Sequence, residues 1–223
     1  DGYTLLVMAN SSILAQALRS GPGHDIERDL APVAVVAIQP LILLVHPAVP
    51  AQSVKEFIAL ARAKPGQINY GSSGVGGASH LAGELFSLLA DVKLVHVPYK
   101  GGGESVVAAA AGQIQSTFAS TTSARALLDA GKLRALAVTS LARTQLLPGA
   151  PSIAESGLNG YDAVVWYSVL GPAALTPEQA TQLNAAFNRL VAAPDMKENY
   201  ARQGLEPQAG TVQHLRTLIR NET

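Results

Sequence analysis

Tyr70-Gly-Ser-Ser-Gly-Val-Gly-Gly-Ala-Ser-His-Leu-Ala-Gly-Glu-Leu-Phe86 contains the signals of a strand end, a loop of serines and glycines, and an amphipathic helix. We expect the helix to begin near Ala78 or Ser79, so that its free N–H groups and positive dipole end point into the loop. Leucines recur at helical spacing after this point and predict one core-facing stripe, made of Leu81, Leu85, Leu88 and Leu89.

The loop has the composition of a small anion site. Its glycines allow a sharp turn and the close approach of a ligand to the main chain, at Gly74, Gly76 and Gly77. Its hydroxyls come from Ser72, Ser73 and Ser79. Such a loop can hold a carboxylate without a charged side chain. An ordinary strand-to-helix turn of small residues fits the glycine pattern equally well. No Gly-Lys-Ser/Thr follows, and position 79 is Ser where a dinucleotide loop has Gly, so we expect no nucleotide site.

Composition narrows the class of protein. Hydrophobic residues make up 48% of the 223 residues and charged ones 14%, which is typical of a globular chain with a sizeable core. The 16 basic residues balance the 16 acidic ones, so we expect no nucleic acid partner. Cysteine is absent and the five histidines lack metal-ligand spacing, so we expect no metal and no cofactor. The longest apolar run, Pro32–Pro47, is interrupted by Gln39 and Pro40, so we expect no membrane insertion.

Strand and helix signals alternate through the middle of the chain. A strand at 68–71 precedes the Ser/Gly loop, and strands at 93–97 and 113–118 are each followed by a helix. Repeated strand–helix units predict an α/β fold with a mainly parallel sheet covered by helices. Capping boxes at Ser53–Glu56 and Pro151–Glu155 predict two more helices, the second a short one ended by Gly157.

Two extended segments fall outside this alternation and suggest a domain boundary. One comprises strands at 33–38 and 41–45 with a bend at Pro40, and the other lies at 164–171. We expect them to join two lobes, the first of residues 1–39 and 166–223 and the second of residues 40–165, with a ligand between them. A single doubly wound domain is the alternative. In the two-lobed arrangement, Trp166 would either line the cleft between the lobes or belong to a hydrophobic core.

Several ordered segments resemble the Bug family, the periplasmic solute-binding proteins of tripartite tricarboxylate transporters. The similar segments are Asp1-Gly-Tyr-Thr-Leu-Leu6, Ser53-Val-Lys-Glu-Phe-Ile58, Tyr70-Gly-Ser-Ser-Gly74, His80-Leu-Ala-Gly-Glu-Leu-Phe86, His96-Val-Pro-Tyr-Lys-Gly101, Ala130-Gly-Lys-Leu-Arg134 and Pro151-Ser-Ile-Ala-Glu-Ser-Gly157. The resemblance implies a two-lobed, type II-like periplasmic binding protein. It also implies a first lobe truncated at its N-terminus, because nothing here matches the βαβ unit with which family members open.

The resemblance further implies periplasmic capture of a small carboxylate by a monomer that delivers it to membrane transporter subunits or to a sensor kinase. Carried over by position, the ligand-binding residues are Asn10, Ser11, Ser12, Ser72, Ser73, Gly74, Gly76, Gly77, Ala78, Ser79, Ala119 and Ser120, to which we add Trp166. Many relatives have an aspartate where this chain has Ala119-Ser120. We therefore expect a ligand without an ammonium group.

An enzyme is the alternative function. The stretch Gly71-Ser-Ser-Gly74 suggests a serine nucleophile, but Gly-x-Ser-x-Gly is absent and the sequence places no Asp or Glu suitably to orient His80 or His96. Such an enzyme would be a hydrolase or a transferase that uses the Ser/Gly loop. Turnover of ester or phosphoester substrates, lost in Ser73→Ala, would identify it. We interpret both histidines as structural, and Tyr99-Lys100 either as anion contacts or as surface residues. With a cradle of neutral donors, we expect ligand affinity to be flat from pH 6 to 8.

Overall fold

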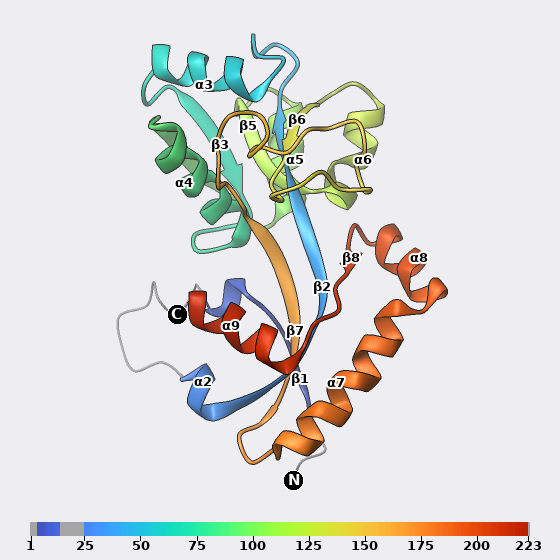
Figure 1. The fold of residues 1–223 in the computed structure, drawn as a ribbon. Helices are drawn as coiled ribbons and strands as arrows, with labels where there is room; N and C mark the ends of the chain where they lie inside the picture. Colours follow the sequence, from blue (N-terminus) through green and yellow to red (C-terminus); the bar gives the residue numbers. More distant parts are fainter. Residues whose placement is uncertain (1–3, 14–24, 223) are drawn as a thin grey trace. The chain divides into compact units, whose positions relative to one another are not determined.

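The computed structural model describes residues 4–13 and 25–222 of the chain. The chain divides into two compact units (Figure 1). Unit 1 comprises residues 1–39 and 165–223, and unit 2 comprises residues 40–164. Two long strands have residues in both units: β2 (Leu30–Val45) and β7 (Val164–Pro172).

Unit 2 contains the Ser/Gly loop and an α/β sheet. Its elements, after the last residues of β2, are α3 (Val54–Ala63), β3 (Ile68–Ser72), α4 (Ala78–Ala90), β4 (Leu94–Pro98), α5 (Gly102–Ala110), β5 (Ser116–Ser120), α6 (Thr121–Asp129) and β6 (Arg134–Val138). The strand order is β6-β2-β5-β3-β4. Strand β3 pairs parallel with β4 and β5, while β2 runs antiparallel to β5 and β6. The predicted α/β organisation, with a sheet flanked by helices, is confirmed. The sheet is mixed and not mainly parallel, because β2 pairs antiparallel on both of its sides.

Helices cover both faces of the unit 2 sheet (Figure 1). Residues of α3 and α4, among them Phe57 and Phe86, form one core layer with alternate residues of β2. Residues of α5 and α6, among them Val106 and Ala124, pack against the residues of β2 on the opposite face. Because successive residues of a strand point to opposite faces, Leu43 and Leu44 belong to different layers.

Helix α4 begins at Ala78, as predicted, but its predicted leucine stripe is wrong in part. The side chains of Leu88 and Leu89 are 76% and 41% exposed. The helix instead buries Ala82, Gly83, Phe86 and Ala90. The cause is the ring of Tyr70, which lies so close that a Cβ on Gly83 would be 2.2 Å from Tyr70 Cε2. A face of small residues lets the helix approach the sheet, and leucines at that face would not fit.

Three local predictions also differ from the structure. The two strands expected on either side of Pro40 form one strand, β2. The expected helix after Pro151 is a turn, in which Ser156 N donates to Ser152 O, because Gly157 ends the segment before a second turn can form. At α3 the Ser53 side chain caps the helix, but the Glu56 carboxylate accepts from Gln52 N instead of the cap residue's own N–H.

Unit 1 has its own sheet, with the order β1-β7-β2-β8. Its further elements are β1 (Leu6–Ala9), α2 (Ile26–Asp29), α7 (Pro177–Ala192), α8 (Pro194–Arg202), β8 (Glu206–Pro207) and α9 (Val212–Glu222). Residues of α2 and α9 pack on one side of the sheet and residues of α7 and α8 on the other. In the part of the chain that the structure describes, no helix is long and apolar enough to cross a membrane.

Candidate functional site

The Ser/Gly loop, residues 73–77, connects β3 to α4 in unit 2. Its start is fixed by Ser72, which is fully buried and whose carbonyl oxygen accepts from Tyr99 N at 3.1 Å. Two glycines in the loop have positive φ angles, +125° at Gly74 and +78° at Gly76, which side chains with a Cβ rarely adopt. The glycine pattern in the sequence therefore marked a real backbone requirement.

Serine hydroxyls hold the loop in place. Ser79 Oγ accepts the N–H of Ser73 at 2.9 Å and contacts Ser73 Oγ at 3.0 Å. Ser72 Oγ accepts the N–H of Gly74 at 3.1 Å. The side chains of Ser72 and Ser79 are 0% and 5% exposed, so these bonds are shielded from water. Hydrogen bonds between neutral groups of the chain itself therefore hold the loop.

The N-terminus of α4 presents unpaired donors beside this loop. The helix is preceded by Gly77, which has no side chain to cap it. Within the described residues, the N–H groups of Ala78, Ser79 and His80 have no acceptor. Three N–H groups at the positive end of a 13-residue helix favour an anion such as a carboxylate.

Two histidine side chains also contact this segment: His80 bonds to the loop itself, and His96 contacts Ser72 just before it. Gly76 N donates to His80 Nδ1 at 3.2 Å, which places the proton of the neutral ring on Nε2. His96 Nε2 lies 2.5 Å from Ser72 Oγ, and the two imidazole rings are 4.1 Å apart. Tyr70 stacks on His96 and donates its hydroxyl hydrogen to Glu84 at 2.6 Å. These contacts support the structural interpretation of both histidines.

Burial lowers the pKa of His96 below its ordinary value of 6.5, and the neighbouring His80 lowers it further, against a weaker opposing effect of Glu84. The folded state therefore binds fewer protons at this site than the unfolded state. This contribution to stability is complete above pH 6.5 and is lost as the pH falls through the folded pKa. We expect the unfolding free energy to fall between pH 7.5 and 5.5, and to fall less in His96→Asn, as measured by urea denaturation. Equal pH dependence in both proteins would contradict this assignment.

The structure brings most of the residues predicted for unit 2 to one edge of its sheet. Strands β3 and β5 are parallel, so Ser72 and Ser120 lie at the same edge, where both strands end. Ser120 caps α6 through its hydroxyl, which accepts from Ser123 N at 3.3 Å. Ala119 is different, because its side chain is 2% exposed and packs in the core between the sheet and α6.

Two of the residues predicted for unit 1, Asn10 and Trp166, share hydrogen bonds with Glu222, which the sequence analysis did not identify. Asn10 Oδ1 accepts from Trp166 N, and Asn10 Nδ2 donates to Glu222 Oε1 at 3.1 Å. The indole N–H of Trp166 donates to the same carboxylate oxygen at 2.8 Å. Ser11 is half-buried and Ser12 exposed. Glu222 was missed because 56 residues separate it from Trp166 and no local pattern marks it.

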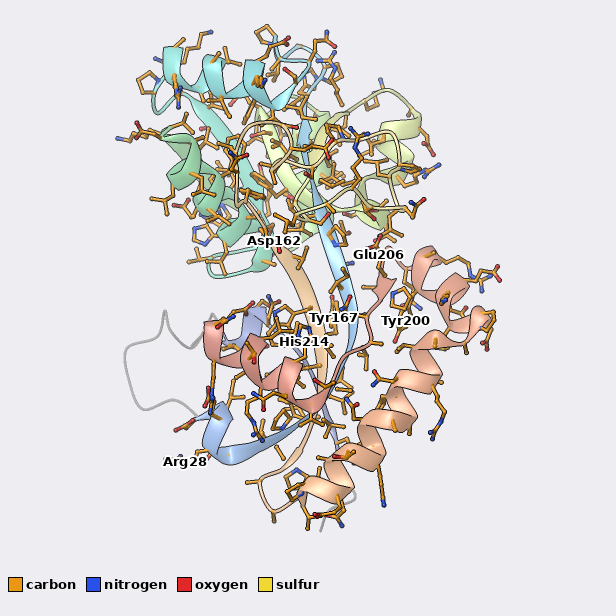
Figure 2. The ribbon with its side chains drawn as sticks, viewed as in Figure 1. Arg28, Asp162, Tyr167, Tyr200, Glu206 and His214 are labelled. Carbon is orange, nitrogen blue, oxygen red and sulfur yellow. The ribbon has the colours of Figure 1, made fainter. Side chains whose placement is uncertain are left out.

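Trp166 is 4% exposed and packs against Leu170 and Leu215, so it is a core residue of unit 1. Its neighbour Tyr167, labelled in Figure 2, packs with the core cluster on the other face of the strand. The Tyr167 hydroxyl donates its hydrogen to Gln39 Oε1 at 3.2 Å. Burial raises the pKa of Tyr167, so this hydroxyl stays protonated at neutral pH.

Comparisons with known proteins agree with this fold. Residues 1–223 match the family described as the tripartite tricarboxylate transporter family receptor, TctC. The chain is 32% identical to Protein BugT of Bordetella pertussis over 224 residues, which cover 100% of the chain and 69% of BugT. It is similar in structure to R. palustris Rpa4515 with adipate (TM-score 0.84, 32% identity), covering 100% of this chain and 75% of that one. It also resembles MatC from Rhodopseudomonas palustris with bound malate (TM-score 0.80, 25% identity, 100% and 77% coverage).

Proposed function

Because the chain belongs to the tripartite tricarboxylate transporter receptor family, we propose that it is a periplasmic solute-binding protein that captures a small carboxylate at the Ser/Gly loop. The observation that carries this proposal is the set of unpaired N–H groups of Ala78, Ser79 and His80 beside a loop held by hydrogen bonds of the chain itself. They supply donors only, which matches the acceptor oxygens of a carboxylate. The remaining sites expected from the sequence, Asn10, Ser11, Ser12, Ser120 and Trp166, stay predictions.

Simple mono- or dicarboxylates fit the loop best. The edge of the sheet beside Ser72 ends in Ala119-Ser120, which has no carboxylate to pair with an ammonium group. Two structural neighbours are described with adipate and with malate, both dicarboxylates. We therefore expect this chain to prefer such acids to amino acids of similar length, and to pass them to membrane transporter subunits or to a sensor kinase.

The direct test is calorimetric titration of the purified chain with adipate, malate, succinate, hexanoate, glutamate and lysine. We expect saturable binding of one or more dicarboxylates and a thermal stabilisation that grows as RT ln(1 + [L]/Kd). The affinity should be constant from pH 6 to 8, because the cradle consists of backbone N–H groups and hydroxyls. Tight binding of amino acids with no response to dicarboxylates would contradict the proposal.

A serine hydrolase is the alternative that one contact favours, the 2.5 Å approach of His96 Nε2 to Ser72 Oγ. Three observations weigh against it. Ser72 is 0% exposed, and its hydroxyl already contacts both the N–H and the carbonyl oxygen of Gly74. No carboxylate among the described residues bonds the second ring nitrogen of His96, so the ring lacks the orienting partner of a triad. We expect hydrolysis of p-nitrophenyl acetate to be the same for the native chain, Ser72→Ala and Ser73→Ala.

A further inference from the structure

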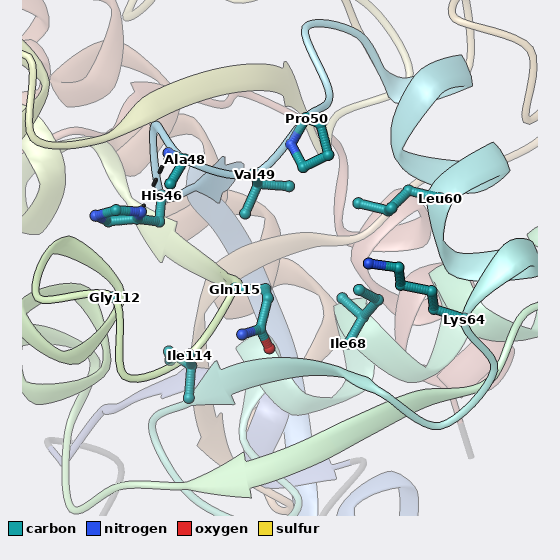
Figure 3. Close-up of a pocket in the computed structure, with 10 residues that line it drawn as sticks. All are labelled: His46, Ala48, Val49, Pro50, Leu60, Lys64, Ile68, Gly112, Ile114 and Gln115. Atoms are coloured by element: carbon teal, nitrogen blue, oxygen red, sulfur yellow. Dashed lines mark hydrogen bonds between the residues drawn. The ribbon is translucent and has the colours of Figure 1, made fainter.

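A cavity of about 290 Å³ opens on unit 2 away from the Ser/Gly loop (Figure 3). Ile68, the first residue of β3, lines this cavity, whereas Ser72, the last residue of the same strand, begins the loop. At roughly 3.3 Å per residue, about 13 Å of strand separates the two places. The volume is near the lower end of the range for small-molecule sites.

Apolar side chains form the body of the cavity. Ile68 and Ile114 are 4% and 3% exposed, and Val49 and Leu60 join them from the segment after β2 and from α3. These residues come from four segments, so the hydrocarbon surface is held by the packing of the unit and not by one flexible loop. A ligand's hydrocarbon chain placed there would leave water at a gain of about 0.8 kcal/mol per buried methylene group.

The polar side chains of the cavity present hydrogen-bond donors. Gln115, which lies between His46 and Lys64 in Figure 3, uses its Oε1 to accept from Asn69 N at 2.8 Å. Its NH₂ group has no acceptor within the described residues, so both N–H donors of this amide are available to a ligand.

The two basic side chains of the cavity, His46 and Lys64, also present hydrogen-bond donors. His46 Nδ1 accepts from Ala48 N at 3.2 Å, so the neutral imidazole carries its proton on Nε2 and donates there. The Lys64 ammonium, just beyond the end of α3, can only donate. No acidic residue is among those that line the cavity. An ammonium ligand would therefore meet like charge and unmatched donors, whereas a carboxylate would satisfy them.

We propose that this cavity is a second ligand site of the chain, for a small carboxylate with a short hydrocarbon tail. The carboxylate contacts Lys64 and the amide of Gln115, and the tail lies on Ile68 and Ile114. All of these groups line this one cavity, so the site stands apart from the Ser/Gly loop and from the function proposed for it.

The test is NMR titration of the uniformly ¹⁵N-labelled chain with hexanoate, with hexylammonium as the charge-reversed probe. We expect saturable hexanoate shifts at the Gln115 side-chain NH₂ and at the backbone N–H groups of Asn69 and Ala48. Lys64→Glu should weaken the binding that these signals report at least about tenfold, because it replaces an attractive charge with a repulsive one. Lys55→Glu is the matched control, since Lys55 is exposed on α3, the helix that precedes Lys64, but does not line the cavity.

Three results would overturn the proposal. They are the absence of saturable shifts at these three signals up to about 50 mM hexanoate, equal shifts with hexylammonium, or an unchanged affinity in Lys64→Glu. The Ser79→Ala variant separates this site from the loop. The cavity signals should respond to hexanoate in that variant as they do in the native chain, even if no ligand binds at the loop. Shifts confined to residues 73–80 would instead assign all binding to the loop.

Discussion

Phe86→Ala is expected to lower the unfolding free energy of unit 2 by about 3–5 kcal/mol, a large part of the stability of a typical domain. Phe86 is 0% exposed, and its ring lies 5.8 Å from Phe57, 6.1 Å from Phe118 and 6.4 Å from Tyr161. These rings come from α3, β5 and the segment before β7, so removing Phe86 leaves a cavity between elements that cannot all close on it. Urea denaturation followed by far-UV circular dichroism measures the change.

Leu88→Ala is the matched control for this prediction. Leu88 is on the same helix, two residues further along, and is 76% exposed. Its loss should change the unfolding free energy by less than about 0.5 kcal/mol. The single tryptophan, Trp166, belongs to unit 1, so its fluorescence provides a separate probe of that unit. Similar losses of unfolding free energy in Phe86→Ala and Leu88→Ala would contradict the assignment of the core face of α4 to Phe86.

Ser79→Ala is expected to weaken carboxylate binding at the loop by tenfold or more. The change removes the acceptor for Ser73 N and the partner of Ser73 Oγ, both in a site that is nearly closed to water. An unpaired buried N–H costs about 1–3 kcal/mol, which the loop can avoid only by moving away from the geometry that presents the donors of α4. Titration calorimetry with adipate measures the loss.

Ser87→Ala supplies the control, because it makes the same chemical change on the same helix. Ser87 Oγ donates to Gly83 O at 2.9 Å, within α4 and away from the loop. We expect the adipate affinity of this variant to stay within about twofold of the native value. An unaffected affinity in Ser79→Ala would show that the ligand contacts a different part of the chain.

The sequence predicted those features that depend on neighbouring residues. Glycines and serines specify the loop after β3 locally, and the start of α4 at Ala78 follows from them. The face that α4 buries was predicted incorrectly, because helical spacing counts leucines but contains no information on the ring of Tyr70 that excludes them. The helix expected after Pro151 does not form. The capping residues can start a helical turn, but Gly157 ends the segment before a second turn follows.

Contacts between distant residues account for what the sequence could not provide. Ser72 and His96 are 24 residues apart, and Gln115 reaches Asn69 across 46 residues. The pairing of β3 with β4 and β5 creates these contacts. Both histidines were interpreted as structural from their neighbours alone, but which atoms they hold became evident only from the folded chain.

The bonds that Ser79 and His80 make to the loop also have a kinetic consequence. Because Ser73 N and Gly76 N already have hydrogen-bond partners, the loop should lose little conformational entropy when a ligand binds. Association should then proceed without a slow rearrangement of this segment, at similar rates for all small carboxylates. Differences in affinity among ligands should appear as differences in residence time, so the chain would discriminate between acids by how slowly it releases them.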